Sequence, residues 1–221
     1  GTGTEDEILG KIRELVTYLP SNCEDTDSYM ECTDDLNRTC DDITACAGDT
    51  SIALSMISDD SFYMEMKKDY APEMVTAFIR LNGATVGCVA NRSEVYTDGE
   101  KTATYDAALT AAGCEKAAAF VNFCNAFEIP VLTLTNVNGF KNCMCNEKKI
   151  AKAAARLTYA FANADVPKVT VVVGKANGTA GLTMNSKSIG SDIVYAWKNA
   201  KIGVMEAAPA VKIMYADEIA K

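Results

Sequence analysis

The pattern that most constrains this fold is a regular alternation of helix-like and strand-like segments in the second half of the chain. Residues 106–127 carry apolar side chains at helical spacing, and residues 130–135 read as a short buried strand. The pair recurs, with a helix expected over 146–164 and a strand over 167–173. Because an outer helix connects neighbouring parallel strands, the sequence predicts a layered α/β domain with a largely parallel sheet.

Shorter patterned segments flank this alternation. Asn82-Gly83 separates two apolar runs, 75–81 and 84–90, and supplies the positive φ angles of a type I′ hairpin turn. Residues 92–104 are expected to form a loop. The remaining expected elements are helices over 5–19, 51–57 and 208–215 and strands over 61–66, 192–196 and 202–205.

Composition bounds the class of protein. The 221 residues are 48% hydrophobic, enough for a substantial core, and the formal net charge is −9. The acids concentrate between Cys23 and Asp42, where only Arg38 opposes them. An acidic surface disfavours nucleic acid and anionic membranes as partners. We expect an N-terminal helix and acidic linker over 1–60, followed by one domain over 61–221.

The ends of the chain indicate a piece of a longer protein. The sequence begins at Gly1 without a basic and apolar leader and stops at Lys221 without an obvious terminator. No apolar run approaches the roughly 18 residues of a membrane span, so no membrane contact is expected. We expect a cytoplasmic location.

The cysteine and histidine contents restrict the chemistry. Nine cysteines, several in apolar contexts such as Cys88, Cys114 and Cys124, are expected to be reduced. The others, including Cys143-Met144-Cys145, lack paired C-x2-C spacing, so no metal is expected. The chain has no histidine, which excludes Ser-His-Asp and Cys-His catalysis.

One turn stands out as a candidate site. Val169–Val173 runs through Gly174-Lys175-Ala176-Asn177 into Gly178-Thr179-Ala180-Gly181. A strand that turns into a helix through small residues leaves backbone N–H groups free to bind an oxyanion. The alternative is that small residues only let helix and sheet pack closely, and the turn by itself leaves both interpretations open.

A series of sequence blocks, in order over nearly the whole chain, carries a family resemblance. The blocks are Ile12-Arg13 to Tyr18-Leu19-Pro20-Ser21-Asn22, Asp34-Asp35 to Arg38, Ser61-Phe62, Val75-Thr76 to Arg80-Leu81-Asn82-Gly83, Val86-Gly87 to Val89-Ala90-Asn91, Phe120–Phe127, Ile129–Leu132, Leu157–Ala162, Val166–Thr170, Met184–Lys187, Val194–Trp197 and Ala210–Tyr215. With these blocks the chain resembles the C-terminal half of biotin-dependent carboxyltransferases: the acyl-CoA and propionyl-CoA carboxylase β type and the similar α subunits of sodium-pumping decarboxylases.

The resemblance implies a crotonase-like (ClpP/crotonase) α/β fold of repeated β-β-α units with outer helices. In that family the N-terminal half binds acyl-CoA, the C-terminal half binds biotin, and each active site lies between two protomers. This chain would therefore be the biotin-binding domain without the family's closing segment. Its implied partners are an acyl-CoA-binding N-terminal half, a biotinyl carrier protein, the acyl-CoA substrate and further copies in a homo-oligomer.

The resemblance also implies site residues. Backbone N–H groups of Gly178, Thr179 and Ala180 would hold the biotin ureido oxygen, and Asn138, Gly139 and Phe140 would wall the biotin pocket together with Gly181. The chain departs from the family at Thr179, Gly181 and Asn138, where relatives usually have Gly or Ser, an aromatic residue and Pro. These departures affect the biotin geometry and substrate choice more than the fold.

The expected function is carboxyl transfer between carboxybiotin and an acyl-CoA. Two alternatives stay open: a subunit of a biotin-dependent acyl-CoA decarboxylase, which runs the transfer backwards, and a non-catalytic half that supplies an interface and docks a biotinyl carrier. The missing histidine suits this chemistry, because oxyanion donors are needed more than a side-chain base.

Overall fold

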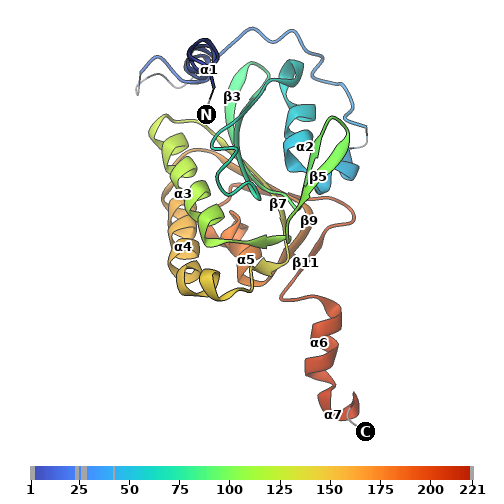
Figure 1. The fold of residues 1–221 in the computed structure, drawn as a ribbon. Helices are drawn as coiled ribbons and strands as arrows, with labels where there is room; N and C mark the ends of the chain where they lie inside the picture. Colours follow the sequence, from blue (N-terminus) through green and yellow to red (C-terminus); the bar gives the residue numbers. More distant parts are fainter. Residues whose placement is uncertain (1–2, 23–24, 26–28, 42, 220–221) are drawn as a thin grey trace.

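A computed structural model describes residues 3–22, 25, 29–41 and 43–219 (Figure 1). Helix α1 (Glu5–Tyr18) begins at Thr4, which forms a capping box with Glu7, and it ends with Tyr18 buried against the domain. Within the described residues, no helix is long and apolar enough to cross a membrane. The expected linker over 1–60 is only partly described, and it includes α2 (Thr50–Ile57), capped by the Asp49 side chain.

The centre of the molecule is a seven-stranded sheet in the order β1-β2-β3-β7-β9-β10, with β11 also paired to β9. Strands β1, β2 and β3 are antiparallel, whereas β7, β9, β10 and β11 continue in parallel. The bounds are β1 Tyr63–Glu65, β2 Met74–Leu81, β3 Ala84–Asn91, β7 Val131–Val137, β9 Lys168–Asn177, β10 Ile193–Ala196 and β11 Lys201–Gly203.

The predicted Asn82-Gly83 hairpin is confirmed, with φ of 53° and 78° at the two turn residues. The expectation of a loop over 92–104 is wrong. Strands β4 (Glu94–Thr97) and β5 (Glu100–Thr104) form a second hairpin through Asp98-Gly99, which also has positive φ at both positions. Asp-Gly is itself a hairpin signal, so the sequence did contain this information.

The two faces of the sheet are covered differently (Figure 1). Helices α3 (Ala111–Ala126) and α4 (Met144–Asn163) pack on each other against one face, and α2 lies on the other. The larger core lies under α3 and α4 and contains Phe78, Val121, Leu157 and Phe161. The order β2-β3-α3, followed by β7, β8 (Gly139–Phe140) and α4, repeats one strand-strand-helix unit, as expected.

The predicted start of one helix and the predicted end of one strand are wrong. The helix expected from residue 106 begins only at Ala111, because Thr110 caps it by accepting a hydrogen bond from the Gly113 N–H at 2.9 Å. Residues before it form β6 (Ala108–Leu109), which pairs with β8 (Gly139–Phe140). The strand expected over 167–173 extends to Asn177, because Lys175, Ala176 and Asn177 pair with β11. The turn expected at 174–177 is therefore strand.

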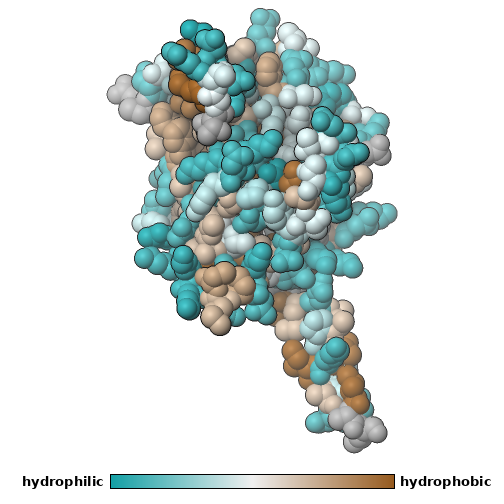
Figure 2. Space-filling model, in the orientation of Figure 1, coloured by the Kyte–Doolittle hydropathy of each residue, from teal (hydrophilic) through white to brown (hydrophobic). Residues whose placement is uncertain are grey.

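The chain ends in a segment that leaves the body of the domain. Helices α6 (Ala207–Met214) and α7 (Ala216–Ile219) extend away from the sheet (Figure 1). We call residues 204–219 the C-terminal arm. Its apolar side chains are exposed, with 81% of Val204 and 74% of Met214 accessible, and they form brown patches in Figure 2.

Candidate functional site

The site begins where β9, a central strand of the sheet, passes directly into the short helix α5 (Gly178–Thr183). Asn177 is still extended, with φ of −105°, and Gly178 turns the chain with φ of +58°. A Cβ atom at Gly178 would lie 3.0 Å from the Val204 carbonyl oxygen. Glycine is therefore favoured at this position both by its backbone conformation and by the close approach of the arm.

A cavity of about 240 Å³ lies at this junction. Three segments far apart in the sequence meet around it: the end of β7 with β8, the start of α5, and the first part of the C-terminal arm. The lining residues are Asn138, Gly139, Phe140, Asn177, Gly178, Thr179, Ala180, Val204, Met205, Glu206 and Pro209. Of the seven residues expected in the site, six line one cavity.

Gly181 is the expected site residue that does not line the cavity. A Cβ atom there would lie 2.8 Å from the Ala176 carbonyl carbon, so the residue lets α5 pack closely on β9. Close packing was the alternative interpretation of the whole turn, and at this position the geometry favours it.

The backbone at the start of α5 offers hydrogen-bond donors. A helix leaves its first N–H groups without intrahelical acceptors. Across the described part of the chain, no hydrogen bond pairs the N–H of Gly178, Thr179 or Ala180 with a protein acceptor. Ala180 is buried, Gly178 is partly exposed and Thr179 is exposed. The donors and the cavity therefore belong to the same turn.

Two asparagines join the segments across the cavity. The Asn177 side-chain amide donates to Asn138 Oδ1 at 2.6 Å. This bond ties the N-cap residue of α5 to the loop before Gly139, so the two walls are held at a fixed separation. Neither the spacing of these residues in the sequence nor their type predicts this contact.

An ion pair closes the rim of the cavity. Lys175 on β9 donates to the Glu206 carboxylate at the start of the arm. The hydrogen bond and charge of Lys175 lower the pKa of Glu206, with a smaller contribution from Lys201. Glu206 is therefore ionised at neutral pH, with its charge largely balanced by Lys175. Glu206, Val204, Met205 and Pro209 were not anticipated as site residues, because only the paired register of β11 and β9 brings the arm to the turn.

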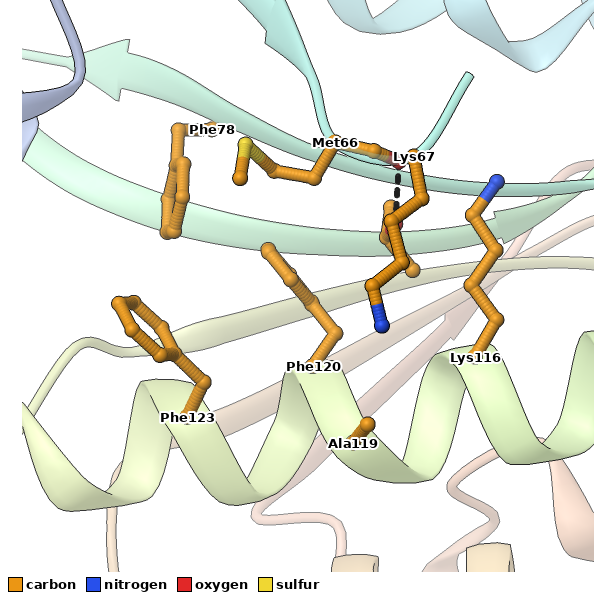
Figure 3. A pocket seen from close by; sticks show the side chains of 8 residues that line it. Met66, Lys67, Phe78, Lys116, Ala119, Phe120 and Phe123 are labelled. Atoms are coloured by element: carbon orange, nitrogen blue, oxygen red, sulfur yellow. Dashed lines mark hydrogen bonds between the residues drawn. The ribbon is translucent and has the colours of Figure 1, made fainter. Parts of the chain in front are cut away.

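A second cavity, of about 140 Å³, lies between α3 and the sheet (Figure 3). Its walls are mainly apolar, including Met66, Phe78, Phe120 and Phe123, and Lys116 rises from α3 at one end. Burial lowers the pKa of Lys116 to about 8. Thr76, a polar lining residue, uses its hydroxyl to bind the Met66 carbonyl at 3.0 Å. Its lining is mainly apolar, whereas the cavity at α5 is bordered by the backbone of Gly178, Thr179 and Ala180.

The sequence and the fold are shared with known proteins. The chain matches the family described as Carboxyl transferase domain over residues 2–221. It is 37% identical over 227 residues to the propionyl-CoA carboxylase beta chain of Cereibacter sphaeroides, covering 96% of this chain and 42% of that protein. It is 36% identical over 225 residues to the methylmalonyl-CoA decarboxylase subunit alpha of Propionigenium modestum, covering 96% of this chain and 41% of that protein.

The structure also matches the crystal structure of a transcarboxylase 12S hexamer solved with hydrolysed methylmalonyl-coenzyme A. The TM-score is 0.83 at 36% identity, over 95% of this chain and 40% of that one. The domain is thus a crotonase-like α/β domain of the carboxyltransferase class. The chain belongs to the carboxyl transferase domain family, and it spans about two fifths of the length of these relatives.

Proposed function

We propose that this chain is the biotin-binding half of an acyl-CoA carboxyltransferase, moving a carboxyl group between carboxybiotin on a carrier protein and an acyl-CoA. The observation that carries this proposal is the cavity where Asn138–Phe140 and Gly178–Ala180 meet. These are the two segments that the family resemblance implies for biotin. Relatives named as propionyl-CoA carboxylase and methylmalonyl-CoA decarboxylase subunits support the acyl-CoA class without deciding the direction of transfer.

The lining of the cavity fits a biotin head group. That group is a fused ring with one carbonyl oxygen, so it needs hydrogen-bond donors at one point and apolar surface elsewhere. The N–H groups at the start of α5 supply donors, and Phe140, Val204 and Met205 supply apolar surface. When bound, the group carries the transferable carboxyl on a ring nitrogen.

The role of the α5 turn is electrostatic. Negative charge grows on the ureido oxygen as the carboxyl group leaves, and fixed N–H dipoles stabilise such charge without reorganising. Gly178, Thr179 and Ala180 would hold these donors at the cavity. Lys175 balances the Glu206 carboxylate at the rim, which keeps that carboxylate from opposing charge development. No side-chain base is required from this half.

The C-terminal arm supports the proposed partners. Its exposed apolar residues include Ile213, Met214 and Ile219, and exposed apolar patches mark protein contacts. We propose that the arm packs on an acyl-CoA-binding half within a homo-oligomer. Because Val204 and Met205 also line the cavity, that contact would complete the site.

The central experiment replaces Ala180 by proline in the full-length enzyme, which removes one donor from the turn. Loss of one oxyanion donor typically slows a reaction about 10²–10³-fold. We expect carboxyl transfer to slow on this scale while acyl-CoA binding changes little. A circular dichroism melt verifies that the variant is folded.

A matched control places proline in the first turn of α3. Ala112→Pro changes a residue outside the cavity at the second position of α3, one position before the counterpart of Ala180 in α5. Its turnover should stay within about threefold of the unmodified enzyme, since it removes no proposed oxyanion donor. The proposal is contradicted if the Ala180→Pro enzyme is folded and its turnover is unchanged, or if the control variant slows equally. Either result would mean that the turn has only a packing role.

The half-site assignment has its own test. This chain alone, mixed with carboxybiotin and several acyl-CoAs, is expected to show no turnover, because acyl-CoA positioning belongs to the other half. Titration with a biotinylated carrier domain should still give saturable binding. Turnover by the isolated chain would overturn the assignment. If the chain binds the carrier domain but Ala180→Pro leaves full-length turnover unchanged, the result would favour a non-catalytic half that only docks the carrier.

A further inference from the structure

A pair of thiols lies at the start of α4, outside the proposed biotin cavity. Cys143 is the N-cap residue and Cys145 lies in the first turn, and their Sγ atoms are 3.1 Å apart. Cys145 is exposed and Cys143 is partly exposed, so small molecules can reach both sulfurs. Neither the proposed carboxyl transfer nor the packing of the core uses them.

The backbone between the two cysteines already suits a disulfide. For two residues separated by one other, the φ and ψ angles of the middle residue set the Cα–Cα distance. Met144 is the residue between the two cysteines, and it belongs to α4. Helical geometry at Met144 gives a Cα–Cα distance of about 5.4 Å. Disulfides span roughly 4.4–6.8 Å between Cα atoms, and the two sulfurs would have to approach by about 1 Å to reach bonding distance.

The surroundings of Cys143 favour its thiolate form. The Cys145 thiol, the Asn146 N–H and the Lys141 ammonium all favour its thiolate and lower its pKa. Burial has the opposite effect in the core, where it raises the pKa of Cys114 to about 12 and also raises the pKa of Cys88 and Cys124. Thiolates, and not thiols, attack disulfides. The reactive and the inert cysteines are thus separated in space.

We propose that Cys143 and Cys145 form a redox-active dithiol that low-molecular-weight disulfides oxidise to an intramolecular disulfide. The Cys143 thiolate attacks one sulfur of the small disulfide, which forms a mixed disulfide and releases one thiolate. Cys145 then loses its proton to solvent and attacks Cys143 Sγ, which releases the second small thiol. The protein loses two electrons and two protons, and the small disulfide gains them.

The first turn of α4 is anchored independently of the thiols. The Asn146 side chain donates to the Lys141 carbonyl oxygen at 2.8 Å and accepts from the Ala111 N–H at 2.7 Å. These bonds hold the helix start on the domain in either redox state. The oxidised ring would therefore form without unfolding, and it would be readily reduced, as exposed disulfides generally are.

The test incubates the folded chain with glutathione buffers of graded oxidation, followed by acid quenching, alkylation and peptide mass spectrometry. We expect a Cys143–Cys145 disulfide to form before any other cysteine is modified, and dithiothreitol to reverse it. Cys145→Ser should stop at a glutathione adduct on Cys143. Cys143→Ser should react at least about tenfold more slowly, because the activated thiolate is gone.

Lys141→Met is the matched control for activation, since it keeps both thiols and removes the neighbouring cation. It should slow the first step by a few-fold while the final disulfide still forms. The proposal is overturned if no Cys143–Cys145 disulfide forms in any buffer. It is equally overturned if Cys32, Cys40 or Cys46 is oxidised first, or if Cys145→Ser gives no adduct at Cys143.

Discussion

The body of the domain buries its apolar side chains, whereas the C-terminal arm exposes them. Under α3 and α4, Leu157 and Phe161 are fully buried, whereas Ile213 and Met214 on the arm are mostly exposed. Burial of apolar area is the main stabilising term in folding. The body therefore holds itself together, whereas the arm leaves apolar side chains exposed for the contact that we propose. The cavity lies where the two regions meet.

Ion pairs show the same difference in burial between the body and the arm. Arg92 is buried at the edge of the body, where it pairs with Glu65 at 3.1 Å and binds the Pro72 carbonyl oxygen at 2.6 Å. The ion pair between Lys175 and the arm residue Glu206 is exposed. Removal of one member of a buried pair is costly, whereas exposed pairs contribute little.

Arg92→Met should give the largest loss of stability, because it leaves Glu65 and the nearby Asp49 buried without their cation. We expect the free energy of unfolding to fall by about 3–5 kcal/mol. Urea denaturation measures it. The control Lys101→Met breaks the exposed pair with Glu94 and should cost less than about 1 kcal/mol. Equal effects of the two variants would contradict the distinction between buried and exposed pairs.

Leu157→Ala tests the core under α4 directly. The side chain is fully buried, so its truncation should lower the free energy of unfolding by about 2–5 kcal/mol. Tyr159, two residues further along the same helix, is 69% exposed, and Tyr159→Ala should change stability by less than about 0.5 kcal/mol. Thermal and urea denaturation of both variants compare the two faces of α4. A small effect at Leu157 would mean that α4 is not part of the core.

Lys116→Met should stabilise the chain, with a dependence on pH. Burial depresses the pKa of Lys116 from 10.5 to about 8, so folding is opposed wherever the lysine must be charged. The penalty is full below pH 8 and disappears as pH rises toward 10.5, where the unfolded chain also loses the proton. We expect a gain of about 1–3 kcal/mol at pH 7.

The measurement for Lys116 is the difference in urea denaturation between variant and unmodified chain at each pH. Comparing variants removes the contribution of Tyr63 and the buried cysteines, which also titrate at high pH. The gain should shrink between pH 8 and 10. A difference independent of pH would mean that the variant acts through packing beside the apolar cavity and not through charge.

Ile213→Ser should have the smallest effect. The side chain is 67% exposed, so stability of this chain should change by less than about 0.5 kcal/mol. In the full-length protein the same change should weaken assembly, which sedimentation velocity would detect. A large loss of stability in the isolated chain would instead make the arm part of the body.

Sequence reasoning predicted most of the elements because each has a local physical origin. The Asn82-Gly83 turn and the apolar stripes of α3 and α4 are fixed by nearby residues, and all three are present. The wrong predictions lie where pairing with a strand distant in the sequence determines the structure of a segment, and not its local pattern. Residues 174–177 look like a turn but are strand, because β11 pairs with them, and residues 106–110 belong to a small parallel pair and a helix cap.

For the candidate site, the amino-acid types available for chemistry can be read without a structure. Gly178 indicates a sharp turn, and the lack of histidine excludes Ser-His-Asp and Cys-His catalysis. The folded chain adds three contacts that no local pattern indicates: Val204, Met205 and Glu206 complete the cavity, Asn138 binds Asn177, and Gly181 lets α5 pack closely on β9. Local sequence specifies turns and helix faces, but contacts between distant segments depend on strand register, which is settled only when the whole sheet forms.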